Sequence, residues 1–254
     1  MHNDLFTIGR LTFHGYGLMI GLGILAAYWM SESRARKRLL DPDHLFYLLI
    51  YGAGFGFISA KLLYYITILD EIIKDPGLLL NLSGGFVVYG GIIGGILAGY
   101  VYCRVKRINF LQYLDLVAPS IALAQGFGRI GCLLAGCCYG VESNLPISIT
   151  FQNSQFAPNG IALFPTQIAS SVFDFFNCFL LLTLSKKERS SGQISAFYLI
   201  FYSLGRFVIE FFRGDIIRGS VGFFSTSQFI SLFAAMAGFF LLWKTSRKRE
   251  KTGY

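Results

Sequence analysis

The segment GRIGCLLAGCCYG, residues 128–140, combines residue types that rarely share an apolar stretch. It contains Arg129, the thiols of Cys132, Cys137 and Cys138, and several glycines. Placing an arginine in hydrocarbon costs ~2.5–3.5 kcal/mol on insertion scales, so such a residue usually faces a cavity or an anionic partner. Arg129 is therefore a candidate for binding an anionic group.

The three thiols permit four interpretations, and the sequence leaves the choice between them open. As zinc ligands they match poorly, because structural zinc sites usually combine two C-x-x-C-like pairs, and no metal site is expected. A disulfide of Cys132 with Cys137 or Cys138 is a second interpretation. A nucleophilic Cys137 or Cys138, with its thiol pKa lowered by Arg129, is a third. Packing of small polarisable side chains is the fourth.

The elements that carry these residues are predicted to be membrane spans. Of the 254 residues, 54% are apolar and only 14% are charged, and the mean hydropathy is +0.56. A transmembrane helix needs ~20 mainly apolar residues. The sequence therefore predicts an all-α, polytopic integral membrane protein with a single domain, residues 1–254. Seven transmembrane helices are expected, at residues 12–30, 44–68, 85–103, 111–134, 164–184, 193–212 and 226–243.

Basic residues are concentrated in alternate loops. Loops 31–43, 104–110 and 185–192 and the C-terminal tail are rich in Lys and Arg, whereas loops 69–84 and 135–163 are not. The positive-inside rule then places the N-terminus outside and the C-terminus in the cytoplasm. The net charge of +8 follows from these loops, and no nucleic-acid partner is expected. The polar, Pro/Gly-containing loop 135–163 is predicted to be an outward-facing loop or small cap.

This topology places polar residues from several spans at one depth, in the outer half of the membrane. The set comprises Tyr16, Lys61, Tyr89, Arg129, Gln167, Tyr202, Arg206 and Glu210. Polar atoms at that depth need partners or water, which predicts a shared cavity. The excess of cations over Glu210 favours an anionic ligand, and arginine forks match phosphate oxygens, so a phospholipid head group is expected. The alternative for Arg206 is an ion pair with Glu210, four residues further along the same helix face.

A glycine-rich stretch, GGFVVYGGIIGGILAG at residues 84–99, lies within the third predicted span. Small residues at this spacing allow two helices to approach closely in a membrane. The alternative is that the backbone at Gly90 approaches a ligand.

In order along nearly the whole chain, a set of short motifs resembles the prolipoprotein diacylglyceryl transferase family. The motifs are HGYGLM (14–19), SAKLLYY (59–65), GGFVVYGGIIGG (84–95), DLVAPSIALAQGFGRIG (115–131), FPTQ (164–167), YSLGRFVIEFFRGD (202–215) and STSQFISL (225–232). The resemblance implies a bacterial cytoplasmic-membrane enzyme that acts at the outer face. Its reaction moves a diacylglyceryl group from phosphatidylglycerol to a cysteine thiol in the lipobox of an exported prolipoprotein, and no cofactor is implied.

The resemblance also implies roles for individual residues. The candidate catalytic residues are Arg129, Arg206, Tyr89 and Tyr202, and the candidate substrate-binding residues are Tyr16, Lys61, Gly90, Gly131, Gly140, Gln167 and Glu210. The two arginines match residues that hold the donor phosphate and stabilise its developing charge.

The chain departs from the family pattern GRxGNxxNGExxG at three positions. Cys132 and Ala135 replace the two asparagines, and Cys137 replaces the glutamate. Tyr89 stands where the family usually has a histidine. These changes keep two alternatives open: a paralogue that uses Cys137 or Cys138 with another acceptor, and a non-enzymatic phospholipid-binding or transport protein.

Overall fold

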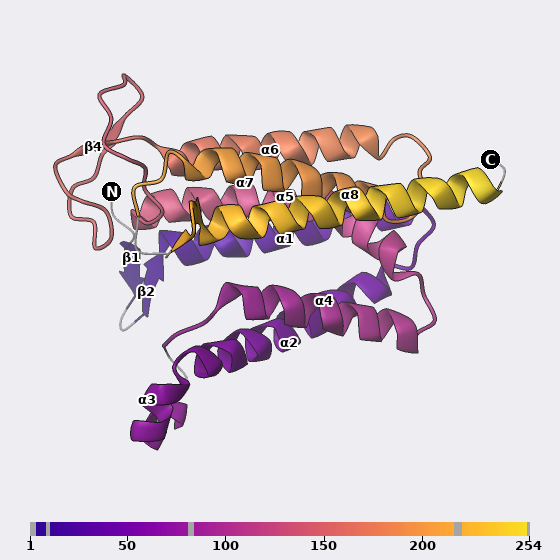
Figure 1. The fold of residues 1–254 in the computed structure, drawn as a ribbon, viewed down its shortest axis with the longest axis horizontal. Coiled ribbons are helices and arrows are strands. Elements are labelled where there is room, and N and C mark those ends of the chain that lie inside the picture. Colours follow the sequence, from indigo (N-terminus) through magenta and orange to yellow (C-terminus); the bar gives the residue numbers. More distant parts are fainter. Residues whose placement is uncertain (1–3, 9–10, 81–83, 216–219, 253–254) are drawn as a thin grey trace. The chain divides into compact units, whose positions relative to one another are not determined.

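The computed structural model describes residues 4–8, 11–80, 84–215 and 220–252 and consists mainly of α-helices (Figure 1). The helices are α1 (Gly15–Lys37), α2 (Asp43–Thr67), α3 (Leu69–Lys74), the 3₁₀ helix η1 (Pro76–Leu80), α4 (Val88–Val105), α5 (Phe110–Ala135), α6 (Thr166–Leu184), α7 (Gln193–Glu210) and α8 (Thr226–Thr252). Three antiparallel pairs of short strands accompany them: β1 (Asp4–Ile8) with β2 (Leu11–His14), β3 (Ile149–Thr150) with β4 (Ala162–Leu163), and β5 (Ser220–Val221) with β6 (Phe224–Ser225).

Five helices in the described part of the chain are long and apolar enough to cross a membrane. They are α2, α4, α5, α6 and residues 226–247 of α8. The prediction of an all-α polytopic membrane protein is thus confirmed. The other two predicted spans also form helices, α1 and α7, but their composition is less apolar. The reason is visible in the sequence, since α1 contains several glycines and tyrosines and α7 carries Arg206 and Glu210.

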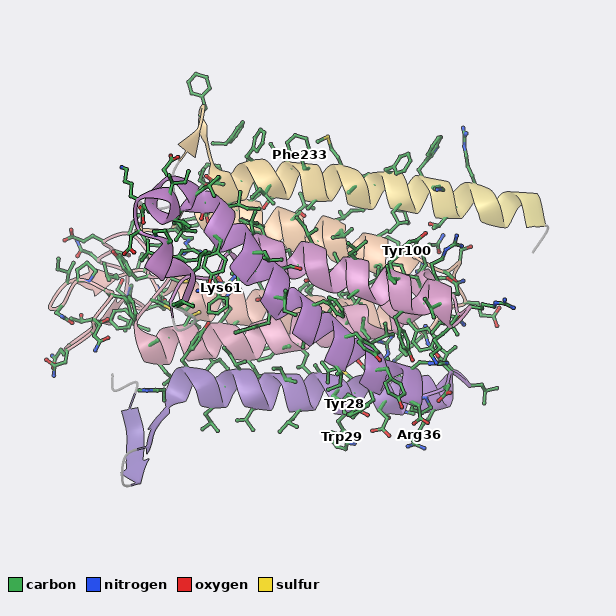
Figure 2. The ribbon with its side chains drawn as sticks, turned by 90° about the horizontal axis from the view of Figure 1, so that it is seen from below. Tyr28, Trp29, Arg36, Lys61, Tyr100 and Phe233 are labelled. Atoms are coloured by element: carbon green, nitrogen blue, oxygen red, sulfur yellow. The ribbon has the colours of Figure 1, made fainter. Side chains whose placement is uncertain are left out.

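Large apolar side chains cover the outside of the helices. Trp29 on α1 is 76% exposed and Phe233 on α8 is 54% exposed, and Figure 2 shows both pointing away from their helices. In water such a surface would promote association, whereas in a bilayer it faces lipid chains of similar polarity.

The chain divides into two compact units, residues 34–113 and residues 1–33 with 114–254. In the first unit α2 and α4 lie side by side (Figure 1). Gly90 makes this contact possible, because a Cβ there would lie 2.5 Å from the Ser59 carbonyl oxygen and 2.8 Å from the Leu63 Cβ. Gly56 likewise faces the Gly91 carbonyl of the other helix. The glycine-rich stretch therefore serves helix packing, one of the two uses predicted for it.

The second unit, here called the α5–α8 unit, contains residues 114–135 of α5, helices α6–α8 and residues 15–33 of α1, which run side by side (Figure 1). Its buried apolar core includes Ala118, Ala122, Cys178, Leu181 and Ile194. A buried carboxylate joins α5 to the start of α7. Asp115 accepts hydrogen bonds of 2.7 Å from the backbone N–H groups of Gly192 and Ser195 and from the Ser195 hydroxyl. These bonds satisfy donors at a helix N-terminus, so Asp115 is structural.

The connection between α5 and α6 folds back on itself and contains β3 and β4. It encloses a small apolar cluster of Phe151, Ala157 and Leu163, each at most 4% exposed. Together with the β1–β2 hairpin, it lies at one end of the helix bundle of this unit (Figure 1). The segment has its own buried side chains, as a cap would; that it faces outward stays a prediction.

Candidate functional site

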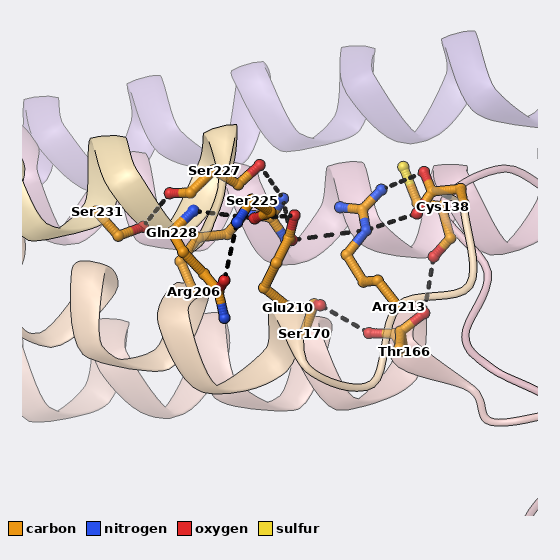
Figure 3. Close-up of polar contacts among 11 residues, drawn as sticks. Cys138, Thr166, Ser170, Arg206, Glu210, Arg213, Ser225, Ser227, Gln228 and Ser231 are labelled. Atoms are coloured by element: carbon orange, nitrogen blue, oxygen red, sulfur yellow. Dashed lines mark hydrogen bonds and ion pairs between the residues drawn. The ribbon is translucent and has the colours of Figure 1, made fainter. Parts of the chain in front are cut away.

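Polar side chains from four elements meet near the end of α7 (Figure 3). We call Arg129, Arg206 and Arg213, with Asp174, Glu210 and Asp215, the arginine cluster. In it each arginine has a carboxylate oxygen within 4.0 Å. All six residues belong to the unit that contains α5–α8.

Arg206 contacts side chains of both α7 and α8. Its Nη2 lies 2.7 Å from Glu210 Oε2, one turn further along α7, and donates a 2.9 Å hydrogen bond to Ser227 Oγ at the start of α8. The ion pair predicted as the alternative for Arg206 is therefore present. A guanidinium has five N–H donors, so these two contacts leave it able to bind a further anion.

Glu210 connects this arginine to the next. Its Oε1 accepts a 2.9 Å hydrogen bond from Ser225 Oγ, and its Oε2 lies 3.8 Å from Arg213 Nε. Arg213 forms a two-pronged contact with Asp215. Burial by itself lowers the pKa of the Arg213 guanidinium. The hydrogen bonds and charge of Asp215 outweigh this effect, so the net shift of the pKa is upward. Arg213 therefore stays charged at any physiological pH.

Arg129, on α5, faces a carboxylate that sequence reasoning missed. Asp174 on α6 is 2% exposed, and its Oδ2 lies 4.0 Å from Arg129 Nε. One signal in the sequence could have revealed it. Thr166, Gln167, Ser170, Ser171, Asp174 and Asn177 recur at three- and four-residue spacing and form one buried polar face of an otherwise apolar helix. With Asp174 and Asp215 included, the carboxylates match the arginines in number, whereas the sequence analysis counted only Glu210.

Two of the predicted tyrosines accompany the arginines. Tyr202 stacks on Tyr198 with ring centroids 5.7 Å apart and lies within electrostatic range of Arg129 and Arg206. Tyr16 on α1 is 40% exposed. The neighbouring Gly131 allows it to approach α5, because a Cβ on Gly131 would lie 3.1 Å from the Tyr16 ring. Gly131 thus determines where Tyr16 lies.

The three thiols converge at the end of α5. The Sγ atoms of Cys132, Cys137 and Cys138 all lie within 4.8 Å of one another, and this is the one group in the described part of the chain with the residue types and proximity of a metal site. We call it the thiol cluster. All the cysteines are free thiols, so the disulfide, one of the four interpretations left open, is not formed. Hydrogen bonds with Cys132 and Cys138, and then burial, raise the pKa of the Cys137 thiol, which is opposite to the lowering that a nucleophilic role requires.

The start of α6 holds the backbone of the thiol cluster. Thr166 Oγ1 donates a 2.7 Å hydrogen bond to the Cys138 carbonyl, and Gln167 Nε2 donates a 2.8 Å hydrogen bond to the Cys137 carbonyl. Gln167, predicted to bind substrate, therefore contacts the thiol segment directly. Gly140 lies against the backbone of Phe164, just before α6, and of Phe212, just after α7. Its lack of a side chain allows the thiol segment to pass between these two helix ends.

The remaining predicted site residues belong to the other unit. Lys61 on α2 is buried, donates hydrogen bonds to the carbonyl groups of Gly84 and Gly85, and lies about 5 Å from the ring centroids of Tyr64, Tyr65 and Phe86. Gly90 packs α4 on α2, as described above. Tyr89, in the first turn of α4, is 40% exposed.

Comparison with known proteins shows clear similarity along nearly the whole chain. The family model described as prolipoprotein diacylglyceryl transferase matches residues 3–244. A phosphatidylglycerol–prolipoprotein diacylglyceryl transferase of Clostridium tetani is 52% identical over 237 residues, covering 93% of this chain and 95% of the relative. Phosphatidylglycerol–prolipoprotein diacylglyceryl transferase 2 of Clostridium perfringens is 46% identical over 96% of this chain and 95% of its own length. A relative in Staphylococcus haemolyticus is 32% identical over 93% of this chain.

Proposed function

The chain belongs to the prolipoprotein diacylglyceryl transferase family, and from this premise we propose which of its residues perform the transfer and on which side of the membrane. The activity is that of its close relatives, whose names give phosphatidylglycerol as donor and a prolipoprotein as acceptor. The enzyme transfers the diacylglyceryl group to the lipobox cysteine thiol of the precursor.

The observation that carries the assignment is the pairing of Arg129 and Arg206 with carboxylates inside an apolar helix bundle. Each arginine is held in place by one acidic partner, Asp174 or Glu210. Pre-positioned guanidinium groups in a site of low polarity stabilise a developing negative charge strongly, because they need not reorient during the reaction. The arginines therefore bind the donor phosphate and stabilise it as the leaving group.

The chemical step is an attack of the acceptor sulfur on a carbon of the donor. The acceptor thiol gives its proton to water, its sulfur bonds to the glycerol carbon that bears the phosphate, and the carbon–oxygen bond breaks. The electron pair leaves with glycerol phosphate, whose charge Arg129 and Arg206 compensate. Tyr202 and Tyr16, beside the arginines, donate hydrogen bonds to the head group. Tyr89 is proposed as a further catalytic residue on the basis of its motif alone.

The orientation of the enzyme is also part of the proposal. Seven helices, α1, α2, α4, α5, α6, α7 and α8, cross the membrane, with the N-terminus outside and the C-terminus in the cytoplasm. The support is the Lys/Arg-rich composition of alternate loops. In this orientation the arginine cluster lies in the outer half of the bilayer, where a phospholipid head group and an exported precursor both have access.

Release of glycerol phosphate and lipidation of a lipobox peptide by the purified protein test the assignment. Replacing Arg129 by Ala should lower transfer by about 10²–10³-fold, as expected for loss of one charge-stabilising group. Lys106→Ala, in a predicted cytoplasmic loop, is the matched control for removal of a cation and should retain transfer. Full activity of folded Arg129→Ala protein would overturn the role of this arginine.

A further inference from the structure

The thiol cluster is a chemically distinctive group that has no role in the transfer steps proposed so far. Cys132 is buried, Cys137 and Cys138 are half-buried, and the three Sγ atoms lie within 4.8 Å of one another. Three bonds of ~2.3 Å from sulfur to one zinc ion place the sulfurs roughly 3.8 Å apart. Small side-chain rotations therefore suffice to bring all three sulfurs onto one ion.

The backbone around the thiols is held in a conformation that directs them together. Gly136 has φ = 74° and Cys138 has φ = 57°, so the chain turns sharply on both sides of Cys137. A left-handed conformation is unfavourable for a residue with a side chain, and it persists where surrounding contacts enforce it. Thr166 and Gln167 supply such contacts through the carbonyl groups of Cys138 and Cys137. The sulfurs are thus arranged before any ion binds.

The charge around the cluster favours an anionic metal complex. Arg129 and Arg213 both lie within electrostatic range of the Cys138 sulfur, and Arg129 also within range of Cys132. Three thiolates with one divalent cation carry a net charge of −1, and both arginines attract that charge although each also has a carboxylate partner. A bound cation replaces the protons of the thiols that coordinate it.

We propose that Cys132, Cys137 and Cys138 form a three-thiolate site for a thiophilic d¹⁰ cation, represented by Zn²⁺, whose fourth position takes the thiol of the acceptor. This differs from the expectation of no metal site drawn from the spacing, because the spacing did not show the convergence of the sulfurs. Sites with three protein ligands leave a tetrahedral ion one open position, as in catalytic zinc centres.

The role of the fourth position rests on the proposed transfer function. The acceptor thiol binds the ion and releases its proton to water, which makes its sulfur a nucleophile at neutral pH. That sulfur then bonds to the donor carbon, and the electron pair of the broken carbon–oxygen bond leaves with glycerol phosphate at the arginines. The ion stays bound to the three cysteines and undergoes no change of oxidation state.

Metal binding is tested first and without any assay of transfer. The full-length protein, reduced and stripped of metal in detergent, should bind one Zn²⁺ per chain in equilibrium dialysis. With Co²⁺ it should show the thiolate-to-metal charge-transfer absorption of a multi-thiolate site. Cys132→Ser, Cys137→Ser and Cys138→Ser should each weaken binding at least tenfold, and Cys103→Ser and Cys178→Ser should not. Absence of stoichiometric Zn²⁺ from the reduced wild type, or binding unaffected by the three substitutions, would overturn the site.

Transfer is tested second, on the same preparations. Metal-free wild type should lose at least tenfold in kcat/KM for a lipobox peptide and regain it with Zn²⁺. If the metal binds at the cysteines but transfer is equal with and without it, the acceptor role is overturned while the site stands. If neither form transfers, the proposed function fails independently of the site.

Discussion

Two cations of this protein, the buried Lys61 in the α2–α4 unit and the half-buried Arg206 in the α5–α8 unit, are stabilised by different kinds of partner. Lys61 donates to main-chain carbonyl groups and lies over aromatic rings. Arg206 contacts a carboxylate and a hydroxyl. Carbonyl dipoles stabilise a cation through hydrogen bonds alone, whereas a carboxylate also carries the opposite charge. The contrast indicates that a buried cation in a membrane span can order a loop or build a site, and that its partners distinguish the two.

Replacing each cation by Ala separates these roles and should give the largest effect. Arg206→Ala should lower the transfer rate by about 10²–10³-fold, because it removes a group that compensates charge in the transition state. Lys61→Ala should mainly lower stability, by roughly 1–3 kcal/mol, because two carbonyl groups lose a charged donor. The transfer rate per folded molecule measures the first effect, and thermal unfolding in detergent measures the loss of stability. Equal loss of rate in the two folded variants would remove the distinction and make Lys61 a substrate-binding residue.

The acidic partner of Arg129 provides a second, smaller test. Asp174→Asn keeps the size of the side chain but removes the charge 4.0 Å from Arg129 Nε. Arg129 then loses an orienting contact, and transfer should fall about 10- to 100-fold, as expected for misplacement of a catalytic group. The effect should lie mainly in kcat. An activity equal to wild type would show that Arg129 is positioned by other contacts. Asn177→Ala, on the same buried face of α6, is the matched control for perturbing that face.

The glycine-rich contact tests the other unit, where packing dominates. Gly90→Ala places a methyl group 2.5 Å from the Ser59 carbonyl oxygen, so α2 and α4 must separate. Overpacking of this kind costs about 1–3 kcal/mol. Gly54→Ala is the control, because a Cβ at Gly54 has no atom within 4 Å. In thermal unfolding, the Gly90 variant should be less stable than the Gly54 variant. Equal stability would refute the packing role of Gly90 and leave approach to a ligand as its explanation.

Most of the helix positions could be predicted from apolar runs, because a chain in hydrocarbon must satisfy its backbone within each segment. The predicted spans 44–68 and 193–212 differ from α2 and α7 by at most two residues at either end. The largest differences are at two helix ends: α1 continues to Lys37 and α8 to Thr252, whereas the predicted spans end at residues 30 and 243. Two smaller differences, at helix starts, have local causes. The third span was expected from residue 85, but Gly85 has φ = 66° and α4 begins at Val88. The first was expected from residue 12, where strand β2 continues to His14.

The site was predictable only in part, for a different reason. Arg129, Arg206 and Glu210 stood out because charges are rare in apolar segments. Asp174 lies in an equally apolar segment, but its significance depends on which face of α6 is buried, and that is a tertiary property. The convergence of the thiols depends on a left-handed turn at Cys138, which no spacing rule reveals.

The smallest expected effect concerns the contact between α6 and the thiol segment, where the structural and functional residues of the α5–α8 unit meet. Thr166→Val removes the hydroxyl that binds the Cys138 carbonyl and should cost about 1 kcal/mol. Thr183→Val is the control, because Thr183 donates only to Leu180 within its own helix. Loss of the Thr166 bond loosens the turn that gathers the sulfurs, so Cys137 and Cys138 should react faster with a maleimide in the Thr166 variant than in the Thr183 variant. Equal labelling rates would show that the turn at Cys138 persists without α6, and that the thiol segment by itself fixes the spacing of its sulfurs.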